Sequence, residues 1–286
     1  MVLESIINAT KAEEKKILML GLGFLFSVCA AILAYALGGR DASVLFIAFT
    51  AIPAVPLMYS IIKLEEEKDL KSSKETKILK EHTKALGAFI LLFLGMVLGM
   101  TLVFVVSPWP AVDLLFHSQL ETLSQIQGSS VTGMVSDMGI SSFNTIFFNN
   151  FKVLILALIL SFLFGAGAIF ILAWNASVIA AAIGSFIRSG LASATELIGF
   201  EKLFLYLETI TTGLLMYSIH GVLEIFAYFV AALAGGIISV AVIRKDFRSA
   251  NFESIVYDVT ILFILSLFLL LVAALLEVFV TPLIFN

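Results

Sequence analysis

Residues 217–248 read YSIHGVLEIFAYFVAALAGGIISVAVIRKDFR, and this stretch decides the fold. Its central part, 222–243, is apolar almost throughout and long enough to cross a bilayer as an α-helix. A histidine and a glutamate stand at its start, and the basic cluster RKDFR stands at its end. Because basic loops stay in the cytoplasm, we expect this helix to run inward. The stretch therefore predicts a membrane-spanning protein.

The composition of the whole chain supports the same class. Of its 286 residues, 60% are hydrophobic and 13% are charged, whereas soluble domains carry about 25% charged residues. The net charge of -4 gives no basic surface for nucleic acid. The single cysteine, Cys29, cannot form an internal disulfide, and zinc-type cysteine spacing is absent. We expect an all-α, polytopic membrane protein that holds no metal and no cofactor.

Apolar runs along the chain predict about seven transmembrane helices. The expected spans are 17–37, 42–62, 86–106, 151–172, 177–187, 222–243 and 259–280. Two prolines, Pro53 and Pro56, predict a kink in the second span.

Two apolar segments, 177–187 and 203–219, are only about half the length of a normal span. The simplest arrangement lets 177–187 cross and leaves 203–219 as a re-entrant or interfacial half-helix, so broken helices are expected near 175–221. Which of the two crosses stays open, and six or eight crossings are the alternatives.

Charge divides the chain into three parts. Residues 1–62 form a two-helix membrane hairpin, residues 63–85 a charged linker, and residues 86–286 the main membrane domain. Residues 63–84 carry seven lysines and six acids, whereas residues 107–150 carry no lysine or arginine. The positive-inside rule then places the linker and the N-terminus in the cytoplasm and the 107–150 loop outside a plasma membrane.

Ionisable and amide side chains inside the apolar runs are the candidate functional residues. His220 and Glu224 are four residues apart, so both project from one face of a helix. They could form a structural pair or part of a proton or ion pathway; two ligands do not make a zinc site. Asn175 and Gly221 mark the expected helix breaks. Glu277 is expected near the outer end of the last helix.

Small residues predict close helix packing. Gly165 and Gly167 lie in the expected fourth span, and Gly235 and Gly236 lie in the sixth. Helix faces lined by small residues allow close contacts between helices of one chain or of two subunits, so a homodimer is one prediction. Catalytic motifs such as GxSxG, HExxH and a Walker loop are absent from the sequence, and we expect a protein that is not an enzyme.

Four short motifs carry a family resemblance. They are Asn149-Asn150-Phe-Lys-Val, Gly165-Ala-Gly167, Trp174-Asn175 and His220-Gly221-Val-Leu-Glu224. In this order they resemble the stage II sporulation protein M family, from Leu86 to the C-terminus. The chain departs from the family pattern where Asn-Gly becomes Asn175-Ala176, where Ile225 replaces a proline that often follows the glutamate, and where Ser218-Ile219 precede the His-Gly without a proline. The linker and the helix ends look most like archaeal members.

The resemblance implies a function that the residues alone do not supply. The namesake of the family recruits two peptidoglycan-degrading partners and is itself a scaffold rather than the hydrolase. The resemblance therefore implies an integral membrane scaffold with protein partners still to be named. The alternative is a small-solute or ion transporter or channel that uses broken helices and the His220–Glu224 pair.

Overall fold

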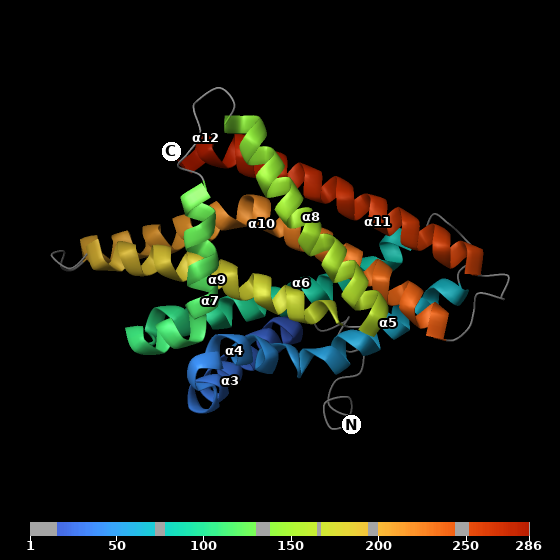
Figure 1. Ribbon diagram of the computed structural model, residues 1–286, viewed down its shortest axis with the longest axis horizontal. Coiled ribbons are helices and arrows are strands. Elements are labelled where there is room, and N and C mark those ends of the chain that lie inside the picture. Colours follow the sequence, from blue (N-terminus) through green and yellow to red (C-terminus); the bar gives the residue numbers. More distant parts are fainter. Residues whose placement is uncertain are drawn as a thin grey trace.

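The computed structural model describes residues 16–71, 78–129, 138–164, 167–193, 200–243 and 252–285. All regular structure within these ranges is helical, which confirms the predicted all-α class. Seven of the described segments are long and apolar enough to cross a membrane, as predicted. Figure 1 shows them as an elongated bundle in which α6, α9, α10 and α11 run along the long axis.

The bounds of the helices are as follows. They are α3 (Lys16–Leu37), η1 (Gly39–Asp41), α4 (Ala42–Ala51), α5 (Ala54–Lys71), α6 (Ile78–Val106), α7 (Trp109–Ser129), α8 (Met138–Phe164), α9 (Ala168–Ser193), α10 (Phe200–Ile243), α11 (Phe252–Leu275), η4 (Leu276–Val280) and α12 (Thr281–Phe285). Here η1 is a 3₁₀ turn and η4 is a π-helix.

Spanning helices α3 and α4–α5 form a tight hairpin at the N-terminal side. Gly39 takes a positive φ of 48° in the turn between them, a conformation that suits glycine. The second span consists of two helices, because α4 ends at Ala51 and α5 begins at Ala54. The predicted proline break is therefore present at Pro53, and Pro56 lies in the first turn of α5, where a missing N–H costs little.

The predicted boundary between the fourth and fifth spans was wrong. The apolar windows run over 143–163 and 168–192, rather than 151–172 and 177–187. Helix α8 ends at Phe164 and α9 begins at Ala168, so Gly167 lies in a turn instead of inside a span. Glycine loses more backbone entropy in a helix than other residues, and the Gly-Ala-Gly run is a favourable place to end one. Gly165 lies outside the described residues.

The structure also contradicts the helix breaks predicted near 175–221. Helix α9 runs through Asn175, and α10 runs through His220-Gly221 without a break, so 203–219 is the first half of a long helix and not a separate half-helix. One glycine costs a helix about 1 kcal/mol, which the packing of a 44-residue helix offsets. At 1.5 Å per residue, α10 is about 66 Å long, more than twice the hydrocarbon thickness.

The α3–α6 interface brings two backbones into direct contact. A Cβ added at Gly23 would lie 2.0 Å from the Leu92 carbonyl oxygen, and one added at Gly95 would lie 2.1 Å from the Leu20 carbonyl oxygen. Ser27 Oγ donates across the interface to the Met96 carbonyl oxygen at 3.3 Å. Only glycine or another small residue permits this approach in a membrane helix pair.

The second half of α10 is the centre of the bundle. Its apolar window, Gly221–Ile243, is 83% buried, whereas the corresponding window in α8 is 17% buried. Phe229 of α10 stacks on Phe89 of α6 at 5.7 Å between ring centroids. Added Cβ atoms at Gly235 and Gly236 would lie 2.4 Å from the Leu158 carbonyl oxygen and 2.7 Å from Ile62 Cγ2. The neighbouring helices α5, α6 and α8 are therefore held close to α10.

Candidate functional site

A polar cluster lies inside the bundle, where α8 meets α10. Asn150 of α8 donates a hydrogen bond from Nδ2 to Glu224 Oε1 of α10. Both residues stand in apolar spanning windows, 143–163 and 221–243. Hydrogen bonding lowers the cost of placing such groups in a membrane, so the pair joins two helices that are 74 residues apart in sequence.

Glu277 completes the cluster from the C-terminal end of the chain. It belongs to the π-helix η4, and its carboxyl lies close enough to that of Glu224 for the two groups to interact electrostatically. Two neighbouring carboxyl groups can form a hydrogen bond with each other only when one of them is protonated. Tyr228, one turn after Glu224 on the same face, is 2% exposed and lies within electrostatic reach of both carboxyls.

The arrangement allows two kinds of chemistry. First, it fastens α8, α10 and the C-terminal η4 segment to one another through polar bonds that the surrounding apolar side chains cannot make. Second, it places two neighbouring carboxyls inside spanning segments, and paired carboxyls of this kind occur in proton relays. Sequence reasoning placed Glu277 near the outer end of its helix and missed its link to Glu224. It also missed Tyr228, although the spacing of four residues from Glu224 was a usable signal.

The other predicted site residues are distributed differently. Asn149 is exposed, next to the bonded Asn150. Asn175 donates from Nδ2 to the Ile171 carbonyl oxygen at 2.8 Å, within its own helix, and so does not cap a break. Gly221 is buried in α10, and an added Cβ there meets nothing within 4 Å. The side chain of His220 lies outside the described residues, so the predicted His220–Glu224 pair stays a prediction.

A second polar region lies on α7, in the segment predicted to be external. One face of α7 is buried against α4, α6 and α9: Phe116 packs edge-on against Phe46 at 5.3 Å and against Phe104 at 5.0 Å. Gln119 donates to Ser177 Oγ at 3.0 Å. The helix is kinked at Phe116, where φ and ψ are non-helical. The sequence predicted residues 107–150 only as an external loop, and it did not identify these buried contacts.

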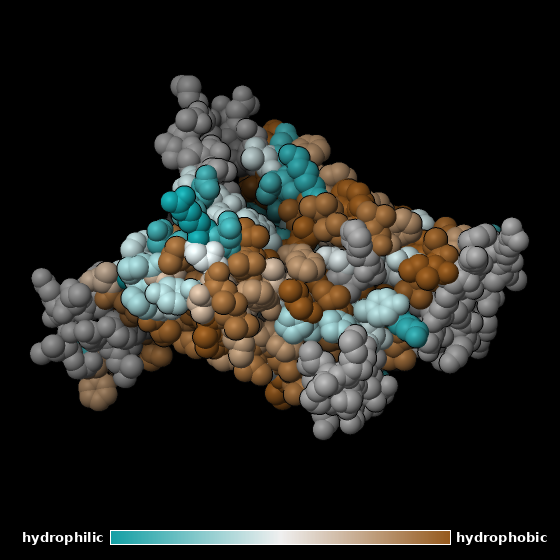
Figure 2. Space-filling model, turned by 60° about the horizontal axis from the view of Figure 1, so that its bottom comes forward, coloured by the Kyte–Doolittle hydropathy of each residue, from teal (hydrophilic) through white to brown (hydrophobic). Residues whose placement is uncertain are grey.

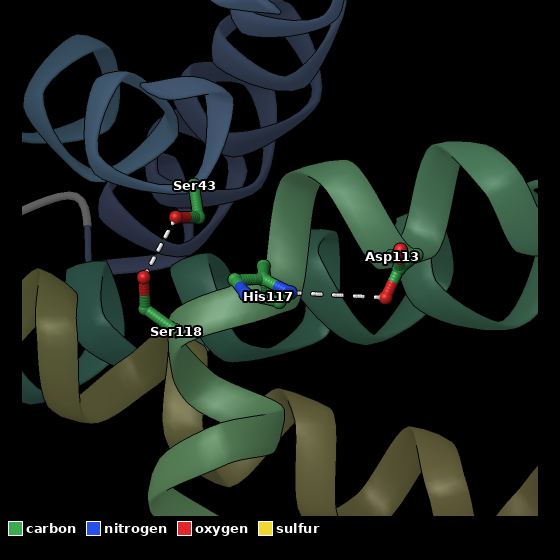
Figure 3. Close-up of polar contacts among 4 residues, drawn as sticks. All are labelled: Ser43, Asp113, His117 and Ser118. Atoms are coloured by element: carbon green, nitrogen blue, oxygen red, sulfur yellow. Dashed lines mark hydrogen bonds and ion pairs between the residues drawn. The ribbon is translucent and has the colours of Figure 1, made fainter. Parts of the chain in front are cut away.

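The opposite face of α7 carries exposed polar groups. His117 Nδ1 lies 3.8 Å from Asp113 Oδ1, and their side chains are 69% and 60% exposed. Figure 3 shows this pair on one side of the helix, while Ser118 turns toward α4 and bonds Ser43 at 2.8 Å between the hydroxyl oxygens. Thus α7 is fixed to the bundle by one face and displays the other.

Arg188 connects α9 to the start of this region. Its guanidinium donates to the carbonyl oxygens of Val105 and Ser107, where α6 ends. It also lies over the rings of Phe104 and Trp109, 5.7 Å from each centroid. A cation at a helix C-terminus is favourable because the last carbonyls carry partial negative charge. Arg188 therefore fixes the α6–α7 junction.

Comparison with known proteins gives a family. The model of the family described as Stage II sporulation protein M matches residues 42–282. The match begins in the second span, so it extends further toward the N-terminus than the resemblance that starts at Leu86. No curated protein and no solved structure matches the chain. The matched range includes α7 and the whole Asn150–Glu224–Glu277 cluster, and the chain belongs to the Stage II sporulation protein M family.

Proposed function

We propose that this protein is a membrane scaffold, and not an enzyme, that binds a partner protein through the exposed face of α7. The observation that carries the proposal is the two-faced packing of α7. Phe116 and Gln119 are fully buried against the bundle, while Asp113 and His117 face outward. A helix held in this way presents polar groups in a fixed geometry, which reduces the entropy lost when a partner binds.

The orientation that suits this role has the N-terminus in the cytoplasm and α7 outside the plasma membrane. Successive spans alternate in direction, so the linker between α5 and α6 and the segment between α10 and α11 belong to one side. The lysine-rich 63–84 run covers the first connection and the helix ends on either side of it, and the RKDFR cluster lies in the second. Residues 107–142, which carry no lysine or arginine and precede the spanning window of α8, belong to the other side. The lysine-rich linker also supports the proposal of an archaeal-type member.

The scaffold proposal is tested by purifying the complex gently from its native membrane and identifying its components by mass spectrometry. The variant is Asp113→Lys with His117→Glu, which reverses charge on the exposed face of α7. The matched control is Arg40→Glu, another exposed charge reversal in the hairpin turn at the predicted external side. We expect a stoichiometric foreign protein with the wild type and the control, reduced at least about tenfold in the variant, since unfavourable rim charges cost several kcal/mol.

The buried carboxyl pair favours a second candidate, a proton-coupled transporter. Glu224 and Glu277 lie beside each other in spanning segments, next to Asn150 and Tyr228. Broken helices play no part in this candidate function, because α9 and α10 are continuous. Reconstituted in vesicles with a pH-sensitive dye inside, the wild type would dissipate an imposed pH gradient faster than Glu224→Gln. Equal rates in the wild type, the variant and protein-free vesicles would exclude uncoupled proton movement through the pair.

A further inference from the structure

An exposed apolar stripe follows α10 along its first half. The stripe consists of Phe200, Phe204, Leu207, Thr211 and Leu215, and it continues to Val222 in the central span. At 100° per residue these positions fall within a sector of about 80°. Phe200 is 78% exposed and Leu215 is 53% exposed. The opposite side of the helix is buried: Thr209 and Gly213 face Gly190 and Phe186 of α9.

The level of this stripe in the membrane can be read from neighbouring contacts. A Cβ added at Gly190 would lie 2.3 Å from Thr209 Cγ2, so these residues are at one level. Two residues before Gly190, Arg188 binds the carbonyl oxygens where α6 ends and lies over the Trp109 ring. Arginine and tryptophan are typical of the membrane–water interface. Thr209 therefore lies near the outer edge of the hydrocarbon, and Leu215 and Val222 lie below it.

This level changes the depth of the carboxyl cluster. Glu224 follows Thr209 by about 22 Å along the helix axis, at 1.5 Å per residue. In a hydrocarbon core about 30 Å thick, Glu224 then lies past the middle of the core and not at the entrance of the span. Sequence reasoning began this span at Val222 and placed Glu224 close to its polar end.

The charges beside the stripe disfavour packing of a second copy of the chain against it. Exposed Glu201 and Glu208 stand on one flank, about 80–100° from Phe200 around the helix. Two copies packed along the stripe would bring acidic flanks together, which is unfavourable. Acyl chains impose no such charge requirement. Figure 2 shows that one face of the bundle carries a broad apolar surface, which is the surface that lipid must cover.

We propose that the stripe on the first half of α10 is a lipid-binding surface in the outer leaflet, continuous with the lipid-facing side of its central span. Helix α10 then enters the hydrocarbon near Thr209. Phe204 and Leu207 lie in the headgroup region, where aromatic and aliphatic side chains can insert while Glu201 and Glu208 reach water.

Nitroxide labelling tests this surface. Because Cys29 is the single cysteine, Cys29→Ser gives a cysteine-free background. Single variants Leu215→Cys, Val222→Cys and Glu208→Cys are labelled and reconstituted in phosphatidylcholine–phosphatidylglycerol vesicles. The measurement compares collision of each label with oxygen, which concentrates in the bilayer, and with a water-soluble nickel chelate. Unchanged melting temperatures show that these exposed substitutions leave the fold intact.

We expect the ratio of oxygen to nickel accessibility to be several-fold higher at position 215 than at position 208, and close to the ratio at 222. High nickel accessibility at 215 would overturn the proposal, because that face would then be in water. Low accessibility to both reagents at 215 would also overturn it. Spin–spin broadening that disappears when labelled protein is diluted with unlabelled protein would then identify a second copy as the cover.

Discussion

Gly23→Ala is expected to destabilise the protein strongly. The added methyl would lie 2.0 Å from the Leu92 carbonyl oxygen and 2.9 Å from the Met96 nitrogen, so α3 and α6 must move apart. Overpacking of this kind costs about 1–3 kcal/mol, and a backbone neighbour cannot rotate away as a side chain can. The separation would also lengthen the 3.3 Å bond from Ser27 Oγ to the Met96 carbonyl oxygen. Thermal unfolding of purified protein in detergent measures the loss.

Gly21→Ala is the matched control on the same helix. A Cβ at Gly21 meets nothing within 4 Å, so the substitution should leave the melting temperature unchanged or raise it slightly through helix propensity. Equal melting temperatures for the two variants would contradict the described α3–α6 interface. A drop of several degrees for Gly23→Ala alone would support it.

Glu224→Leu should also lower stability, because it removes a carboxyl group of α10 that contacts both α8 and η4. The substitution leaves the amide of Asn150 without its hydrogen bond to Glu224 and the carboxyl of Glu277 without its polar neighbour. Each unpaired polar group in an apolar environment costs about 1–3 kcal/mol. We expect a larger fall in melting temperature than Glu224→Gln produces, since glutamine keeps an acceptor for Asn150.

A double-mutant cycle separates the described contact from a general effect of the substitution. Asn150→Leu in the Glu224→Leu background should cost much less than Asn150→Leu alone, because the contact is already lost. Additive effects of the two substitutions would show that Asn150 and Glu224 do not interact. The Glu277→Leu variant gives the corresponding test for the η4 segment.

The sequence predicted the number and kind of the elements because hydropathy reports directly on spanning length. It could not give the ends of the fourth and fifth spans, since the sequence stays apolar between the end of α8 at Phe164 and the start of α9 at Ala168. The predicted breaks followed from the two half-length apolar segments, 177–187 and 203–219, and from the polar residues beside them. Asn175-Ala176 keeps the helix, and the Asn175 amide is satisfied by the Ile171 carbonyl oxygen.

The site was predictable in part. Asn150 and Glu224 were named from the sequence, and the structure joins them. Their partner Glu277 lies 53 residues after Glu224, on the last element, and no local pattern indicates which faces of distant helices meet. The α3–α6 contact did leave a local signal: Gly23 and Ser27 are four residues apart, as are Gly95 and Gly99, which is the small-residue spacing of close helix pairs.

Site-specific photo-crosslinking at position 117 tests the central claim most directly. A photoreactive phenylalanine analogue replaces His117, whose side chain is 69% exposed on α7, and cells are irradiated before extraction. A second variant carries the analogue at Leu283, an exposed position in α12, as the control for random collision. The scaffold account predicts one foreign protein joined to position 117 and absent from position 283. Identical adducts at both positions, or adducts with lipid alone at position 117, would contradict it.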